Sequence, residues 1–73
     1  MTLLKSTKTS ADVQLSFEEV IVINNALNEI CHGISLPEFQ TRIGVSLKNV
    51  ENLLGQFHII INQMKSDGDQ NSQ

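Results

Sequence analysis

The amino-acid sequence predicts an all-α fold with disordered ends and three helices, at about residues 17–32, 36–43 and 47–65. Apolar residues recur at spacings of three and four, which is the period of a helix, whereas a strand shows a period of two. A helix-start pattern also occurs three times, around Ser16, Ser35 and Ser46. In each case an apolar residue precedes the serine and another follows it by four positions. The serine can then cap the start of a helix, and the two apolar residues can pack against each other across its first turn.

The first helix is expected at 17–32. Ser16 is its cap, and Glu19 stands three residues later, which completes a capping box. Gly33 follows the last turn, at a position where many helices end in the left-handed conformation. Six apolar residues of this segment share one helix face and are Val20, Ile23, Ala26, Leu27, Ile30 and Cys31.

The second helix is expected to be short, at 36–43. Ser35 and Glu38 have the spacing of a second capping box. Pro37 lies in the first turn, where the missing N–H of proline costs no hydrogen bond. Gly44 stands where the chain leaves this helix.

The third helix is expected at 47–65, with Ser46 as its cap. Its apolar residues form a stripe of roughly 140° and are Leu47, Val50, Leu53, Leu54, Phe57, Ile60, Ile61 and Met64. Gly55 and Ile59 lie on the opposite, polar side. A glycine within a helix costs about 1 kcal/mol relative to alanine, so Gly55 is either simply tolerated or allows another helix to approach closely.

The two ends of the chain are polar. Residues 1–12 are rich in Lys, Ser and Thr, and residues 66–73 consist mostly of Asp, Gly, Gln, Asn and Ser. Such segments bury too little apolar surface to offset the entropy of ordering them, so we expect flexible tails on either side of a three-helix domain at 13–65. A core this small is marginal, and Cys31, the only cysteine, allows no disulfide within the chain. We therefore expect a homodimeric helical bundle.

Composition limits the partners and the compartment. The net charge of −3 argues against nucleic acid or an anionic membrane as a partner. No apolar run approaches the roughly 18 residues of a membrane-spanning helix, and no targeting segment is visible. A lone cysteine fits a reducing compartment. We expect a soluble, cytoplasmic protein.

Cys31, His32 and His58 are the residues that raise the question of a metal ion. A zinc site takes at least three protein ligands, and no third ligand accompanies Cys31 and His58. The same two residues lack the accessible, electropositive surroundings of a nucleophilic cysteine. No catalytic or cofactor-binding motif is present, so we expect no enzymatic activity, no metal and no cofactor.

Residues 39–53, within the segment 36–58, resemble a helix-turn-helix motif. The residues that carry the resemblance are Phe39, Ile43, Gly44, Val45, Val50 and Leu53. The segment departs from the motif at Gln40, because that position usually holds a small residue between the two crossing helices. The resemblance implies an alternative function as a DNA-binding regulator whose contacts would be Arg42, Ser46, Lys48, Asn49 and Asn52. Only two of these residues are basic, whereas binding to phosphates relies on several Lys and Arg contacts.

Three large apolar residues, Ile21, Val22 and Ile59, point away from the stripes of their helices. A surface of apolar anchors within a polar rim is typical of a protein interface. The predicted interface comprises Ile21, Val22, Asn25, Glu29, Asn52, Gly55 and Ile59. We expect a small interaction or regulatory protein of the adaptor, inhibitor or antitoxin/immunity type, which binds a second copy of itself and another protein.

Overall fold

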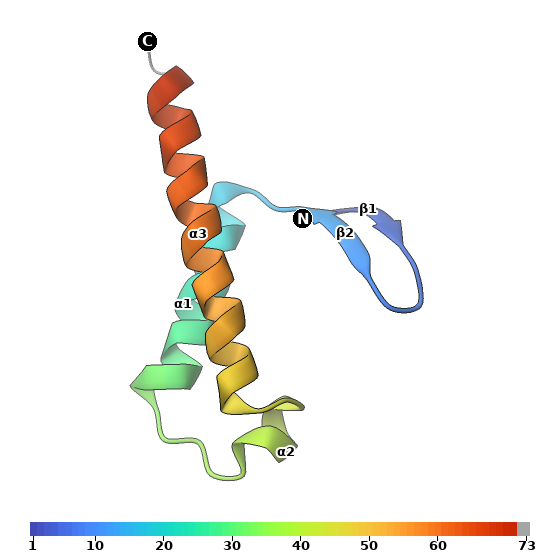
Figure 1. Ribbon diagram of the computed structural model, residues 1–73, viewed down its shortest axis with the longest axis vertical. Coiled ribbons are helices and arrows are strands. Elements are labelled where there is room, and N and C mark those ends of the chain that lie inside the picture. The colour runs from blue at the N-terminus through green and yellow to red at the C-terminus, as the bar shows by residue number, and fades with distance from the viewer. Residues whose placement is uncertain (72–73) are drawn as a thin grey trace.

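Figure 1 shows the computed structural model, which describes residues 1–71 and the side chains of residues 1–67. Its elements are β1 (Thr2–Ser6), β2 (Ala11–Gln14), α1 (Phe17–Asn28), a π-helical turn η1 (Glu29–Gly33), α2 (Phe39–Ile43) and α3 (Leu47–Asn71). The fold is therefore a small mixed one, with three α-helices and a two-stranded antiparallel sheet. The predicted all-α fold class is wrong because of this sheet.

The segment predicted to be a flexible N-terminal tail forms most of the hairpin. Its serines and threonines, which suggested disorder, close the turn between β1 and β2. The Thr7 backbone N–H donates to the Ser10 carbonyl at 2.8 Å. The Thr7 hydroxyl oxygen accepts from the backbone N–H groups of Thr9 and Ser10, at 3.2 and 3.1 Å. Side chains of this kind favour turns because they bond to nearby backbone groups. The predicted domain boundary at residue 13 falls inside β2.

The hairpin contains a bulge at Leu4. Leu3 pairs with Val13, and the next pair is Lys5 with Asp12, so Leu4 is the extra residue. Successive residues of a strand point to opposite faces, so Val13 and Asp12 lie on opposite faces of the hairpin. Each cross-strand partner lies on the same face as the residue it pairs with, Leu3 with Val13 and Lys5 with Asp12. The bulge thus keeps Leu3 and Val13 together on one face and places Lys5 on the other.

Two of the three predicted serine caps are confirmed. The Ser16 hydroxyl accepts from the Glu19 backbone N–H at 3.1 Å, and the Glu19 carboxylate accepts from the Ser16 N–H at 2.9 Å, which is the predicted capping box. The Ser46 hydroxyl accepts from the Asn49 N–H at 3.2 Å at the start of α3.

The cap predicted at Ser35 is wrong. The second helix begins at Phe39, and Glu38 is its cap residue, with a left-handed backbone (φ 53°) and no capping side-chain bond. The reason is local. Leu36 precedes Pro37, and the residue before a proline is sterically disfavoured in the helical region. The helix cannot begin there, and Pro37 and Glu38 form a turn instead.

The predicted helix ends agree with the structure at Gly44 alone. Gly44 has φ 100°, and its N–H donates to the Gln40 carbonyl at 2.8 Å. Gly33 is not left-handed, because the last turn of the first helix widens into η1, where the Ile34 N–H donates to the Glu29 carbonyl at 3.1 Å. The third helix continues beyond the predicted end at residue 65. Residues 66–71, which were predicted to form a flexible tail, belong to α3 instead. Residues 72 and 73 lie outside the described residues.

The long helices α1 and α3 pack side by side in opposite directions (Figure 1). The start of α1 lies beside the middle of α3, since Ile21 and Ile61 line one hollow. The end of the first helix lies near the start of α3, where, in addition to burial, the nearby Glu51 carboxylate raises the pKa of the Cys31 thiol. The buried core of the described residues lies between them and consists of Val20, Val50, Leu54 and Ile61. The short α2 makes few contacts with the other elements.

Candidate interaction surface

The chain exposes more surface than a compact monomer of its size. Its accessible surface is 5764 Å², whereas a compact monomer of this mass exposes about 4,500 Å². Its radius of gyration is 14.6 Å, against roughly 11 Å for a compact domain of this length. The hairpin projects away from the helices, and α3 extends beyond α1 (Figure 1).

The stripes predicted for the helices are wider than the contact between them. In α3, Val50, Leu54 and Ile61 are buried, but Leu53 and Ile60 remain 42% and 41% exposed at one edge of the stripe. One neighbouring helix cannot cover an apolar arc of roughly 140°. The uncovered edge is therefore available to a further partner.

The uncovered edges of the two helices lie on the same side of the pair. In each helix, the facing row is the line of residues that points toward the other helix. When two helices are antiparallel, residues rotated by the same angle and in the same sense from the two facing rows lie on one common side of the pair. Ile21 comes about 100° after Val20, and His58 comes about 60° after Ile61 in the same sense, and both line one hollow between the helices. Residues that come before the facing row must therefore share the opposite side. We call this surface the side face, and it consists of Ile23, Ala26, Leu53 and Ile60.

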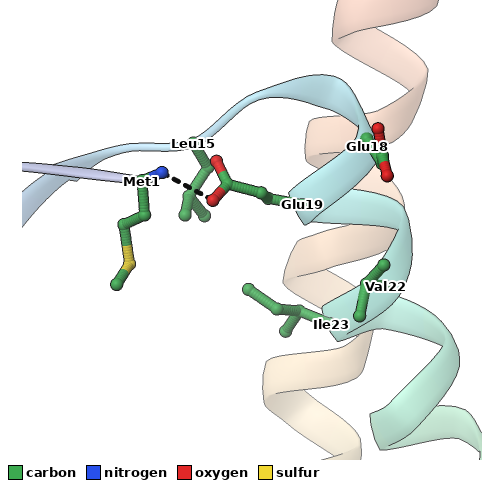
Figure 2. A pocket seen from close by; sticks show the side chains of 6 residues that line it. All are labelled: Met1, Leu15, Glu18, Glu19, Val22 and Ile23. Carbon is green, nitrogen blue, oxygen red and sulfur yellow. Dashed lines mark hydrogen bonds and ion pairs between the residues drawn. The ribbon is translucent and has the colours of Figure 1, made fainter.

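A hollow next to the side face lies between the hairpin and α1. Its volume is about 280 Å³, and it is lined by Met1, Leu15, Glu18, Glu19, Val22 and Ile23 (Figure 2). Val22 is 60% exposed at its edge. Ile23 belongs to both the hollow and the side face, so the two apolar surfaces are continuous.

Glu19 ties the hairpin to the helix at this hollow. Its carboxylate pairs with the Met1 amine at 2.5 Å (Figure 2). The hydrogen bond from the Met1 amine, followed by the bond from the Ser16 backbone N–H, holds the pKa of Glu19 below its ordinary value. These hydrogen bonds thus stabilise the charged form of the Glu19 carboxylate.

We expect this carboxylate to make stability depend on pH. Since the pKa of Glu19 is lower in the folded state, its contribution is present above the ordinary carboxyl pKa and is lost as the pH falls through the folded value. Glutamine keeps the capping geometry, so Glu19→Gln should lower Tm at pH 7, and the difference from the wild type should disappear in acid. Thermal unfolding followed by circular dichroism from pH 7 to pH 2 measures this. Glu18→Gln is the control and should follow the pH dependence of the wild type, because it keeps Glu19. A loss of Tm at pH 7 in Glu18→Gln as large as that in Glu19→Gln, and likewise absent in acid, would contradict the assignment.

A second hollow lies on the opposite side of the helix pair. It is lined by Ile21, Asn24, His58, Ile61, Asn62 and Lys65, and its volume is about 420 Å³. The side-chain carbonyl oxygen of Asn24 is buried without a hydrogen-bond partner. This side is more polar than the side face, so it lacks the apolar centre of a typical protein contact.

The structure does not bring the predicted interface residues together. Ile21 is half-buried in the second hollow, and Val22 lines the first. Asn25 and Glu29 are exposed on the side of the first helix that faces away from α3. The exposed residues on the corresponding outward side of α3 are Asn52, Gly55 and Ile59. Since the helices pack through their inner sides, these two outward sets point in opposite directions.

The residues of the nucleic-acid alternative lie near the base of α3. Arg42, Lys48, Asn49 and Asn52 are exposed, but the Ser46 hydroxyl is engaged as the cap of α3. A helix-turn-helix holds its second helix by packing the first one against it. Contacts between α2 and α3 are too sparse for such packing.

Cys31 is a half-buried thiol. Burial raises its pKa, and the nearby carboxylate of Glu51 raises it further, so the thiol stays protonated near neutral pH. Among the described residues, no group of three or more His, Cys, Asp or Glu side chains gathers as a metal site requires.

A comparison of the chain with protein-family models, curated proteins and solved structures finds no match. Within residues 1–71, no helix combines the length and the apolar character needed to cross a membrane.

Proposed function

We propose that this is a non-enzymatic interaction protein of the adaptor, inhibitor or antitoxin/immunity type, which acts in the cytoplasm by binding a second copy of itself and another protein. The observation that carries the proposal is the uncovered apolar surface. Leu53 and Ile60 on the side face are 42% and 41% exposed, and Val22 at the adjoining hollow is 60% exposed. Large apolar side chains gathered on one surface in this way are typical of a protein contact.

The distribution of residue types supports the same function. The side face and the hollow beside the hairpin together present a continuous apolar centre, and Glu18 and Glu19 stand at its edge. Interfaces combine such a centre with a polar rim, because apolar groups gain most from the loss of water while charged groups are costly to bury. The acidic rim favours a partner with basic residues at the matching positions.

Photo-crosslinking in the native cell tests this function. A benzophenone amino acid is placed separately at Leu53 on the side face, at Ile59 on the outward side of α3, and at Lys48. We expect a discrete protein adduct from Leu53 and none from Lys48, with adducts identified by mass spectrometry. The Ile59 position tests the sequence-based interface in the same experiment.

The alternatives give different results. An adduct between Lys48 and DNA, together with retardation of duplex DNA that weakens steeply with salt, would support the DNA-binding function. Absence of any protein adduct from both Leu53 and Ile59 would overturn the interaction function.

A further inference from the structure

The hairpin has one apolar face and one polar face. Leu3 and Val13 lie opposite each other on the first, and the cross-strand pair of Lys5 and Asp12 lies on the second because of the bulge. Met1 and Leu15 each lie two residues from this apolar pair, so they continue the same face. Both also line the hollow against α1 (Figure 2). We call the continuous apolar area the arm surface, and it consists of Met1, Leu3, Val13, Leu15, Val22 and Ile23.

Most of the arm surface is uncovered within one copy of the chain. Leu3 is 60% exposed and Val13 is 41% exposed, because the hairpin projects away from the helices (Figure 1). A two-stranded hairpin without further packing is at most marginally stable in water. The hairpin therefore needs a surface that covers its apolar face.

We propose that the arm surface is the contact between two copies of this chain, each covering the arm surface of the other; this inference rests on the proposed function and names its first partner. The exposure of the arm surface supports a second copy. Met1 is 77% exposed, and Leu3 and Val22 are each 60% exposed, so large apolar side chains on one continuous surface stand open to a partner. A contact with twofold symmetry uses the same patch on both copies, and one arm surface per chain meets this requirement.

Charge complementarity also supports a second copy. Lys8 stands in the turn of the hairpin, and Glu18 and Glu19 stand in the first turn of α1. Lys5 lies on the polar face opposite Asp12, and Glu19 is paired with the Met1 amine of its own copy, so Lys8 and Glu18 are the charges that a partner meets at the rim. In a reciprocal pair, the turn of each hairpin lies beside the start of α1 in the other copy. Every copy brings both charges, so the patch is complementary to itself.

Neighbouring residues of β2 provide a matched test, since Val13 lies on the apolar face and Gln14 on the polar face. Sedimentation equilibrium and light scattering of the full chain from 1 to 200 µM measure the dimer Kd. We expect the wild type to be dimeric at micromolar concentration. Val13→Asp should weaken dimerisation by about 100-fold, because a carboxylate would be buried in an apolar contact. Gln14→Asp should change the Kd less than about 3-fold, and added salt should weaken the wild-type dimer.

A second pair of variants addresses the case in which Val13→Asp unfolds the hairpin. Val22→Glu alters the helical part of the arm surface, and Asn25→Glu is its control on the outward side of α1. Far-UV circular dichroism confirms that the helices remain. We expect dissociation with Val22→Glu alone.

The outcomes separate this inference from the proposed function. A wild type that is monomeric at 200 µM, or a dimer equally resistant to Val13→Asp and Val22→Glu, would overturn the arm contact. The interaction function would still stand if Leu53 formed a protein adduct in the cell. If neither Leu53 nor Ile59 forms an adduct with another protein while the arm variants dissociate a dimer, the arm contact stands and the binding of another protein is overturned.

Discussion

Replacement of Leu54 by alanine is expected to lower the free energy of unfolding by about 3 kcal/mol, which is typical of a large-to-small change in a core. Leu54 is 4% exposed and is one of only four buried apolar residues in the described part of the chain. Natural domains are stable by roughly 5–15 kcal/mol, and small ones lie at the lower end. The variant should therefore be partly unfolded at 37 °C. Urea denaturation followed by circular dichroism at 222 nm measures the change.

Ile59→Ala is the matched control, because it shortens an aliphatic side chain in the same helix. Ile59 is 70% exposed, so its replacement should change the free energy of unfolding by no more than about 0.5 kcal/mol. If Leu54→Ala cost less than 1 kcal/mol, the packing of α1 against α3 would not be the core. If Ile59→Ala cost as much as Leu54→Ala, the outward side of α3 would be covered in solution.

Gly44→Ala is expected to lower the free energy of unfolding by about 1–2 kcal/mol. Gly44 ends α2 with φ 100°, a conformation in which a Cβ clashes with the backbone of its own residue. Space is not the cause, because a Cβ at Gly44 would meet no atom within 4 Å. Thermal and urea unfolding of the variant measure the loss.

Gly55→Ala is the control for Gly44→Ala, and it is expected to change the free energy of unfolding in the opposite direction. Gly55 lies inside α3, and a Cβ there also meets no atom within 4 Å, so alanine should raise the free energy of unfolding by about 1 kcal/mol. This variant also separates the two interpretations of Gly55. If the glycine is only tolerated, binding is unchanged. If another helix approaches closely at this point, Gly55→Ala weakens the dimer or the protein adduct while it stabilises the helix.

The candidate site could be predicted only in part from the sequence. Val22 was identified because it points away from its helix stripe, and the structure places it in the hollow beside the hairpin. The side face could not be identified in this way. Leu53 and Ile60 belong to the apolar stripe, and the stripe alone does not show that a single neighbouring helix leaves its edge exposed.

Some errors had a signal in the sequence. The steric effect of Pro37 on Leu36 is local and argues against a helix start at Ser35. Residues 11–15 also alternate between apolar and polar side chains, with Val13 between Asp12 and Gln14. Residues 2–6 do not alternate, because the bulge adds Leu4. Short strands with serines and threonines between them also resemble a polar tail.

The sequence by itself determined the features that depend on a few neighbouring residues. The starts of α1 and α3 at Ser16 and Ser46 and the end of α2 at Gly44 are of this kind, because capping bonds and left-handed turns form within about four residues. The tertiary structure decided which residues pair and which remain uncovered. The hairpin needs β1 and β2 to meet across a turn, and the exposure of the arm surface and the side face depends on how much apolar surface one helix can cover for another.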